Sequence, residues 1–162
     1  MEKTAFITGS STGIGRAISE LLLTKKYRVY GYSRSNTIKH PNFIFNPIDL
    51  SNVEATQNIV FPKRENEEVL LINNAAKISN IVPLNLQKET DIVNDYNLNI
   101  ISPTLLCSKF INEFKSKKKI IINISSGAAN NSVACWATYC AAKSALDRLT
   151  NVLSEENHPK LS

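Results

Sequence analysis

Short apolar runs alternate along this chain with longer stretches in which apolar residues recur at helical spacing. The apolar runs, each short enough for one buried β-strand, cover residues 4–8, 27–33, 43–45, 69–72 and 119–124. Helical spacing, or polar residues that permit a helix, is found at residues 14–24, 51–60, 91–114 and 137–153. Continuous apolar strands separated by helices are typical of a parallel sheet. The pattern therefore predicts an α/β fold, a doubly wound parallel sheet with helices on both faces, formed by residues 1–162 as one domain.

Composition narrows the class of protein further. Of the 162 residues, 43% are apolar and 20% are charged, a balance that excludes intrinsic disorder and collagen-like repeats. No apolar run approaches the roughly 18 residues that a membrane span needs, and the opening Met-Glu-Lys leaves no room for a secretory signal before Gly9. The three cysteines, Cys107, Cys135 and Cys140, lack zinc-type spacing. We therefore expect a cytoplasmic protein with no metal site.

The net charge of +5 raises the question of a nucleic-acid partner. The one basic cluster consists of Lys115, Lys117, Lys118 and Lys119. A nucleic-acid interface would need a basic face elsewhere to reinforce such a cluster. A helix C-terminus, whose dipole favours cations, explains the cluster better. We therefore expect no nucleic acid and no membrane among the partners.

A glycine-rich turn follows the first predicted strand. It reads Gly9-Ser10-Ser11-Thr12-Gly13-Ile14-Gly15, and a predicted helix comes directly after it. Glycines let the backbone turn tightly and approach a pyrophosphate, while the helix N-terminus presents unpaired N–H groups and the positive end of its dipole. A tight connection without a ligand is the alternative, but the first strand of an α/β sheet is where dinucleotides bind. The residues expected to bind the cofactor here are Gly9, Ser11, Thr12, Gly13, Ile14 and Gly15.

The end of the second predicted strand indicates which dinucleotide is preferred. NAD sites carry an acidic residue there for the ribose hydroxyl, whereas NADP sites carry an arginine nearby. Here the sequence reads Tyr32-Ser33-Arg34-Ser35, without a carboxylate. An arginine fork can grip the 2′-phosphate, and a plain surface arginine is the alternative. We expect Ser33 and Arg34 to bind NADP (NADPH) in preference to NAD.

Four polar residues are predicted to meet at the carboxyl edge of the sheet. Tyr139 and Lys143 lie four residues apart, on one face of a predicted helix. Ser126 comes just past the fifth predicted strand, and Asn99 opens the long helix that precedes that strand. Ligands of open α/β sheets bind outside the carboxyl ends of the strands. A Tyr-Lys spacing alone is a common surface pair, but this convergence favours a catalytic site.

Hydride transfer to a carbonyl group needs this set of side chains. A proton donor must reach the carbonyl oxygen, and a second hydrogen bond must hold and polarise it. A phenol, whose ordinary pKa is near 10, is a sluggish acid at neutrality, and a nearby lysine cation favours the phenolate. We therefore expect Tyr139 to exchange the proton and Ser126 to hold the substrate oxygen. Lys143 would act on the phenol and bind the nicotinamide ribose.

Taken together, these motifs resemble the single-domain branch of the short-chain dehydrogenase/reductase family over nearly the whole chain. They are Thr8-Gly9-x-x-x-Gly13-Ile14-Gly15, Asn73-Asn74-Ala75, Asn99, Ser126 and Tyr139-x-x-x-Lys143. The resemblance implies a Rossmann-type fold and an NADP-dependent oxidoreductase that interconverts a small-molecule carbonyl and an alcohol. Sepiapterin-reductase-like and benzil-reductase-like members are the most similar.

The same resemblance assigns further residues and a possible assembly. It implies that Asn99 positions a water in a proton relay leading to Lys143. It also implies that Asp49 and Leu50 contact the adenine, and that Asn74-Ala75 lines the cofactor. Because members of this family commonly associate through the corresponding helices, a homodimer or homotetramer is expected by analogy.

The sequence departs from this family at two places. Ala76 stands where the family usually has glycine, a minor change because small residues are tolerated there. After Lys143, nothing supplies the sixth strand, the Pro-Gly loop, the substrate-covering segment and the seventh strand that the resemblance implies. We therefore expect a domain incomplete at its C-terminus, with an exposed edge at the fifth strand and no lid over the pocket. Two hypotheses stay open: an NADP-dependent reductase, or a catalytically inactive remnant that at most binds a dinucleotide or a partner protein.

Overall fold

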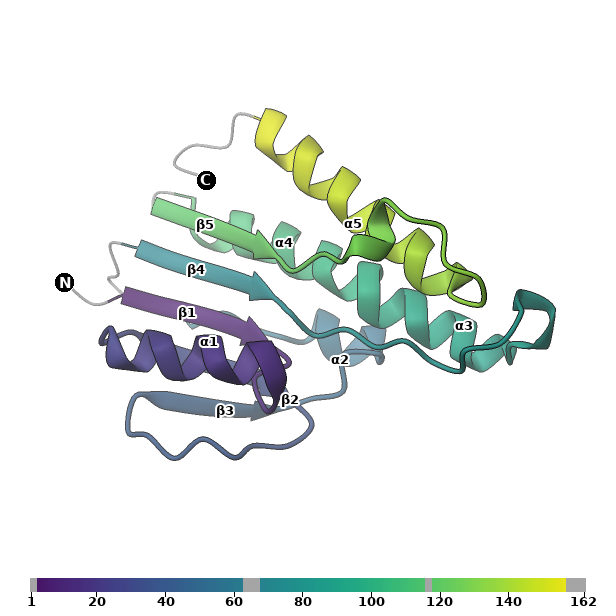
Figure 1. Cartoon of the computed structure of the whole chain (residues 1–162). Coiled ribbons are helices and arrows are strands. Elements are labelled where there is room, and N and C mark those ends of the chain that lie inside the picture. Colours follow the sequence, from purple (N-terminus) through teal and green to yellow (C-terminus); the bar gives the residue numbers. More distant parts are fainter. Residues whose placement is uncertain (1–2, 63–67, 116–117, 157–162) are drawn as a thin grey trace.

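A sheet of five parallel strands organises the chain. The computed structural model describes residues 3–62, 68–115 and 118–156. The strands are β1 (Lys3–Thr8), β2 (Arg28–Ser33), β3 (Phe43–Pro47), β4 (Glu68–Asn73) and β5 (Lys118–Asn123). They lie in the order β3-β2-β1-β4-β5, so the chain changes sides at the central β1 (Figure 1). All five strands predicted from the apolar runs are confirmed.

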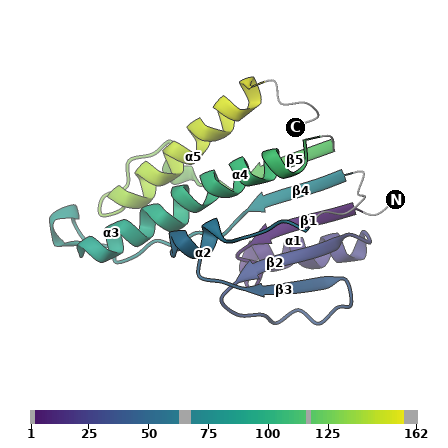
Figure 2. The same cartoon turned by 180° about the vertical axis from the view of Figure 1, so that it is seen from behind.

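Helices cover both faces of this sheet. They are α1 (Gly13–Thr24), α2 (Val53–Gln57), α3 (Glu89–Tyr96), α4 (Ser102–Glu113) and α5 (Ala137–Glu155), with the short turns η1 (Leu84–Leu86), η2 (Asn97–Ile101) and η3 (Gly127–Ala129). Figures 1 and 2, which view opposite sides, show α1 on one face of the sheet and α2 and α4 on the other. The predicted doubly wound, Rossmann-type fold is confirmed. Among the helices of the described residues, none combines the length and the apolar character needed to cross a membrane.

The central strand divides the core into two layers. Successive side chains of a strand point to opposite faces of the sheet. Ala5 and Ile7 of β1 are fully buried in the layer beneath α1. Phe6 points into the other layer, where its ring lies 6.1 Å from that of Phe110 and 5.8 Å from that of Phe114. The continuous apolar run of β1 therefore serves both layers, and it holds the carboxyl edge of the sheet on a packed scaffold.

The helix predicted for residues 91–114 is divided into three parts. α3 ends at Tyr96, the π-helical turn η2 follows, and α4 begins at Ser102. The helical segment predicted for residues 91–114 is confirmed, but Asn99, which was expected to open it, lies in the π turn within it. Such π turns insert an extra residue into the helical ladder and are frequent at functional sites. In this chain η2 contains Asn99, whose fully buried side chain bonds the loop after β4.

The basic cluster is distributed differently from the prediction. α4 ends at Glu113, and Lys118 and Lys119 belong to β5, so they do not form a helix C-terminus. The buried Lys119 nevertheless donates from Nζ to the carbonyl oxygen of Phe114 at 3.1 Å and to that of Lys115 at 3.3 Å. A cation does meet the negative end of the α4 dipole, but it comes from the neighbouring strand. Residue 117 lies outside the described residues.

A charged cluster closes the opposite, amino-terminal end of the sheet. Glu68 accepts a hydrogen bond from the Tyr27 hydroxyl at 2.5 Å and one from Lys118 Nζ at 3.0 Å, and Lys3 Nζ lies 3.7 Å away. The hydrogen bond from Tyr27, followed by that from Lys118, lowers the pKa of Glu68 below its ordinary value. Burial, followed by the hydrogen bond to Glu68, raises the pKa of Tyr27 to about 12. The cluster joins the starts of β1, β4 and β5.

Glu68→Gln is expected to lower the free energy of unfolding at neutral pH by about 0.5–1.5 kcal/mol, because its hydrogen bonds lose their charge. The pKa of Glu68 is lower in the folded chain than in the unfolded chain. Its stabilisation is therefore complete above the unfolded pKa of about 4.3 and disappears as the pH falls through the folded pKa. Urea unfolding at a series of pH values measures this difference.

The matched control is Glu20→Gln, which removes an exposed ion pair with Arg16 on α1. Exposed pairs of this kind contribute little, so the control should cost less than Glu68→Gln. Equal losses for the two variants, or a Glu68→Gln loss that persists in acid, would contradict the role given to this cluster.

Candidate active site

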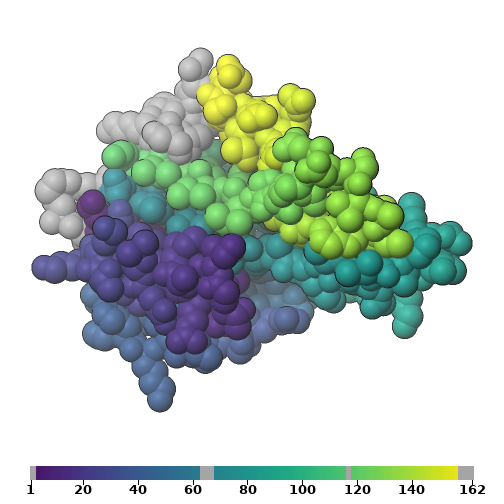
Figure 3. All heavy atoms as spheres, in the orientation of Figure 1, coloured from purple at the N-terminus to yellow at the C-terminus, as the bar shows by residue number. Residues whose placement is uncertain are grey.

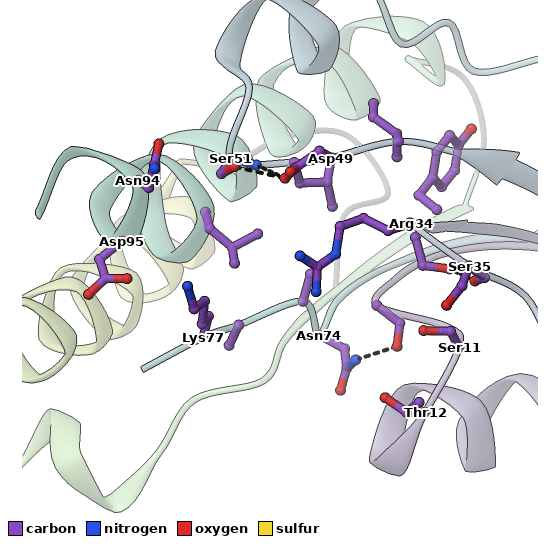
Figure 4. Close-up of a pocket in the computed structure, with 18 residues that line it drawn as sticks. Ser11, Thr12, Arg34, Ser35, Asp49, Ser51, Asn74, Lys77, Asn94 and Asp95 are labelled. Carbon is purple, nitrogen blue, oxygen red and sulfur yellow. Dashed lines mark hydrogen bonds between the residues drawn. The ribbon is translucent and has the colours of Figure 1, made fainter. Parts of the chain in front are cut away.

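A cavity of about 520 Å³ opens at the carboxyl ends of β1, β2, β3 and β4. Figure 4 shows its lining, to which the turn before α1, the end of β2 and the segments after β3 and β4 contribute. The lining includes nine residues expected to bind a cofactor: Gly9, Ser11, Thr12, Ser33, Arg34, Asp49, Leu50, Asn74 and Ala75. It also includes residues that were not among those expected to bind the cofactor, namely Tyr32, Ser35, Ile48, Ser51, Ala76, Lys77, Asn94, Asp95 and Leu98. Segments far apart in the chain thus form one cavity at the predicted edge.

The glycine turn has the geometry that an anion site needs. Gly9 and Gly13 have φ values of 67° and 53°, a region that L side chains rarely adopt. A Cβ on Gly13 would meet nothing within 4 Å, so the space in front of α1 is open. Thr12, the N-cap of α1, makes no side-chain capping bond, and the first turn of α1 has no acidic residue. The N–H groups of this turn are therefore available to a phosphate.

Gly15 has a different role from the other two glycines. It is buried, and a Cβ there would lie 2.3 Å from the carbonyl oxygen of Gly9 and 2.3 Å from Asn74 Nδ2. No larger side chain fits without moving backbone atoms. Gly15 therefore lets the turn close against the segment after β4, and it lies outside the lining of the cavity. Gly13 and Ile14 are also outside that lining, although Ile14 is 61% exposed.

A buried hydroxyl joins the glycine turn to the segment after β4. Thr8 Oγ1 accepts hydrogen bonds from the backbone N–H of Asn74 at 2.9 Å and of Ala75 at 3.0 Å. Asn74 Nδ2 donates to the carbonyl oxygens of Thr8 at 3.0 Å and of Gly9 at 3.2 Å. The Asn-Asn-Ala motif thus fixes the shape of the turn rather than only facing a ligand. The sequence signal for Thr8 was its place in the motif directly before Gly9.

Charged side chains contribute to the lining of the cavity. Arg34 is exposed and extends over the cavity from the end of β2 (Figure 4). The Asp49 carboxylate accepts hydrogen bonds from Ser51 N at 2.9 Å and Ser51 Oγ at 2.8 Å. These two bonds lower the pKa of Asp49, and the charges of Arg34 and Lys77 lower it further. Asp49 is therefore ionised and committed to its own turn, whereas Arg34 and Lys77 offer positive charge to the cavity.

The hydroxyl of Ser33 is engaged within the protein. It donates to the carbonyl oxygen of Ser35 at 2.8 Å and lies 3.2 Å from Ser10 Oγ. Ser33 lines the cavity, but these contacts make it a support for the turn that carries Arg34. The hydrogen bond to Ser35 fixes the direction in which the chain leaves β2.

Tyr139 and Lys143 lie on one face of α5, as their spacing predicted. Lys143 is 2% exposed, and its Nζ donates to the carbonyl oxygen of Ile124 at 2.7 Å. The same Nζ is 5.8 Å from the centre of the Tyr139 ring. Burial lowers the pKa of Lys143, and the charge of Asp147 opposes that change. The phenol therefore has an amine beside it that is held to the end of β5.

Ser126 and Asn99 lie on short turns that pack against α5. Ser126 is the N-cap of η3, and its Oγ accepts a hydrogen bond from Ala128 N at 3.2 Å. Asn99 is fully buried in η2, donates to the carbonyl oxygen of Lys77 at 2.8 Å, and accepts from Lys77 N at 3.1 Å. Both η2 and η3 contact α5. The elements that carry the four predicted catalytic residues are thus brought together, although these residues lie beside the 520 Å³ cavity rather than in its lining.

The glycine turn and the segment after β5 belong to parts of the chain that share one face of the molecule. Figure 3 shows the N-terminal segment in purple and the green segment that leads from β5 towards α5 on the same face of the molecule. The described residues therefore include an uncapped helix N-terminus, a cation at the end of β2 and a phenol–amine pair. Across residues 3–62, 68–115 and 118–156, no cluster of histidine, cysteine and carboxylate side chains suits a metal ion. The groups present can bind a dinucleotide phosphate and transfer a proton.

Comparison with known proteins gives consistent matches over most of the chain. The family model described as short chain dehydrogenase matches residues 3–161. A benzil reductase ((S)-benzoin forming) from Bacillus subtilis (strain 168) is 33% identical over 159 residues, covering 93% of this chain and 65% of that protein. A sepiapterin reductase from Mus musculus is 29% identical over 176 residues, covering 93% of this chain and 67% of that protein. Both subgroups expected from the sequence are therefore confirmed as relatives.

The fold has matches among solved structures as well. The crystal structure of a short-chain dehydrogenase/reductase from Burkholderia vietnamiensis has a TM-score of 0.88 at 28% identity, and covers 99% of this chain and 80% of that one. The chain spans about two thirds of the length of the curated relatives that it matches. The match with this solved structure covers the segments that line the cavity as well as η3 and α5.

Proposed function

Because the chain belongs to the short-chain dehydrogenase/reductase family of oxidoreductases, we propose that it interconverts a small-molecule carbonyl and an alcohol with NADP as the cofactor. Tyr139 is the proposed proton donor and acceptor. The observation that carries the proposal is the Tyr139–Lys143 pair, whose amine lies 5.8 Å from the ring centre and is anchored to Ile124 at the end of β5. We treat residues 1–162 as one dinucleotide-binding domain.

The residues of the cavity fit a dinucleotide. Open space at Gly13 and an uncapped first turn of α1 suit a pyrophosphate. Asp49 and Leu50 form the wall after β3 that would receive the adenine, and Ala75 would line the middle of the cofactor. When bound, the reduced cofactor supplies the hydride. The protein's own part is to hold this group so that its reactive end is near Tyr139.

The proton would be handled by the residues around α5. Tyr139 donates its hydroxyl proton to the carbonyl oxygen during reduction, and Ser126 donates a second hydrogen bond to that oxygen. The ammonium of Lys143 stabilises the phenolate that remains. Asn99, which is bonded to the backbone of Lys77, holds the loop after β4 and would position a water that returns a proton towards Lys143. Each group does what its charge and hydrogen-bonding capacity allow.

The preference for NADP over NAD rests on Arg34. The strand end from Tyr32 to Ser35 offers a cation and no carboxylate, so a 2′-phosphate would be attracted there and not repelled. The charges of Asp49 and Arg34 interact, but the Asp49 carboxylate is hydrogen-bonded to Ser51, and the exposed guanidinium of Arg34 can still bind a phosphate. Lys77 adds positive charge near the same wall.

The test is a fluorescence titration of the purified protein with NADPH, followed by turnover assays with benzil and with sepiapterin as probe carbonyls. Saturable NADPH binding together with carbonyl-dependent oxidation of NADPH is the expected result. Binding without turnover of either probe would contradict the reductase and favour a chain that only binds a dinucleotide. Absence of NADPH and NADH binding would overturn the proposal as a whole.

A further inference from the structure

The first turn of α5 carries Tyr139 but is poorly anchored by its own sequence. α5 begins at Ala137, so Tyr139 is the third helical residue. The N-cap, Trp136, makes no side-chain capping bond, and the first turn of α5 contains no acidic residue. The first N–H groups of a helix have no partner within the helix, and helix ends fray unless other groups hold them. Something outside α5 must therefore keep Tyr139 in place.

A buried carboxylate from another helix reaches this turn. Asp95, on α3, is 2% exposed. Its Oδ2 accepts a hydrogen bond from Thr138 Oγ1 at 3.0 Å, and its Oδ1 accepts one from Ser79 Oγ at 2.5 Å. Asp95 thus joins α3, the segment after β4 and the start of α5. Figure 4 shows Asp95 at the end of the cavity away from Arg34 and Ser11.

The charge of Asp95 also suits its location. The N-terminus of a helix carries the positive end of the dipole, and a carboxylate there is stabilising. Thr138 is 3% exposed, so its bond to Asp95 is shielded from water. Asp95 therefore holds the first turn of α5 from α3 through the hydroxyl of Thr138, and it supplies the negative charge that this turn lacks.

The other end of the Tyr139–Lys143 pair is held independently. Lys143 lies in the next turn of α5 and is bonded to Ile124. If the first turn of α5 opened, Tyr139 would move away while Lys143 stayed in place. We propose that Asp95 is a positioning residue that holds the first turn of α5 and thereby keeps the Tyr139 ring beside Lys143. The catalytic consequence rests on the proposed function, whereas the structural one does not.

Trp136 provides a readout that needs no substrate. It is the single tryptophan, and its ring packs edge-on against that of Tyr139 at 5.9 Å. Opening of the first turn would separate the two rings and expose the indole. Acrylamide quenching of Trp136 emission, measured on the native protein, therefore reports on the position of this turn. Urea unfolding of the same samples gives the global stability separately.

Asp95→Ala should raise the quenching constant of Trp136 by about twofold, because the first turn opens locally. Asp95→Asn keeps an acceptor for Thr138 but loses the charge, so its quenching constant should lie between those of the wild type and Asp95→Ala. The matched control is Asp91→Ala, which removes a carboxylate one turn earlier on α3 that accepts from Asn80 at 3.3 Å. This control should leave the quenching constant of Trp136 unchanged. Thr138→Val deletes only the hydroxyl that donates to Asp95, and it should raise the quenching constant in the same way. It keeps the test decisive if Asp95→Ala does not fold.

Turnover of benzil with NADPH gives the second readout. Asp95→Ala should lower kcat by about three- to tenfold with an unchanged KM for NADPH, since a small misplacement of the proton donor is costly. Asp95→Asn, which keeps the acceptor and loses the charge, should have a kcat between those of the wild type and Asp95→Ala. A wild-type protein that does not reduce benzil or sepiapterin would count against the proposed function only, because Trp136 still decides the role of Asp95. The positioning role of Asp95 would be overturned by unchanged Trp136 quenching in both Asp95→Ala and Thr138→Val. An equal change of quenching in Asp91→Ala would overturn it as well.

Discussion

Tyr139→Phe should abolish carbonyl reduction, with kcat lowered by about 100- to 10,000-fold, because general acid–base catalysis contributes an effect of this size. The substitution removes one hydroxyl and keeps the ring that packs against Trp136 at 5.9 Å. The amine of Lys143 remains bonded to Ile124, so the end of β5 keeps its shape. NADPH affinity should therefore stay close to that of the wild type. Steady-state reduction of the probe carbonyl, with a parallel NADPH titration, measures both quantities.

The control for this variant is Tyr96→Phe. Tyr96 ends α3, is 36% exposed, and lies outside the lining of the cavity. Its phenol should be dispensable for turnover. Near-normal turnover in Tyr139→Phe would remove Tyr139 from the proton-transfer step. A loss of NADPH binding as large as the loss of turnover would instead assign it a binding role.

Arg34→Met is expected to weaken NADPH binding by about 1.5–3 kcal/mol, or roughly 10- to 150-fold, and to leave NADH binding nearly unchanged. A guanidinium can form paired hydrogen bonds to a phosphate, and NADH lacks the 2′-phosphate that would receive them. Arg34 is exposed at the cavity, so a methionine can replace it without disturbing the core. Parallel titrations with NADPH and NADH at several salt concentrations measure the selectivity.

A suitable control is Lys39→Met, which removes an exposed cation of the same segment that is not part of the cavity lining. It tests whether net charge alone explains the change. Equal losses of NADPH and NADH affinity in Arg34→Met, or an equal loss of NADPH affinity in Lys39→Met, would contradict the assignment of the 2′-phosphate to Arg34.

The central strands β1, β2 and β4 were predictable because they are buried on both faces, whereas the edge strands β3 and β5 are only partly buried. β1 must pack with α1 on one side and with the aromatic rings around Phe6 on the other, so its apolar run is continuous. The same holds for β4, in which Val69, Leu70, Leu71 and Ile72 are all buried. Such runs leave few alternatives to a parallel sheet, and the order of apolar runs and helices then indicated a doubly wound fold.

Two predictions were wrong: that Asn99 opens a helix, and that the basic cluster forms a helix C-terminus. Both depend on contacts between segments that are far apart in the sequence. Asn99 lies in the π turn η2, and its side chain bonds both the N–H and the C=O of Lys77. Lys119 continues a strand, yet it bonds the carbonyl of Phe114 at the end of the preceding helix. Neither partner can be read from local periodicity, since both depend on which segments the sheet order brings together.

The amino-acid sequence by itself determined the alternation of strands and helices, the left-handed turn at Gly9 and Gly13, and the shared face of Tyr139 and Lys143. These features depend on steric limits and side-chain spacing within a few residues of the chain. The tertiary structure alone decided that Gly15 packs against Asn74, that Lys77 joins the cavity wall, and that Asp95 reaches the start of α5. Such pairings arise because parallel strands align their carboxyl ends at one edge, where hydrogen-bonding groups from separate loops must satisfy one another.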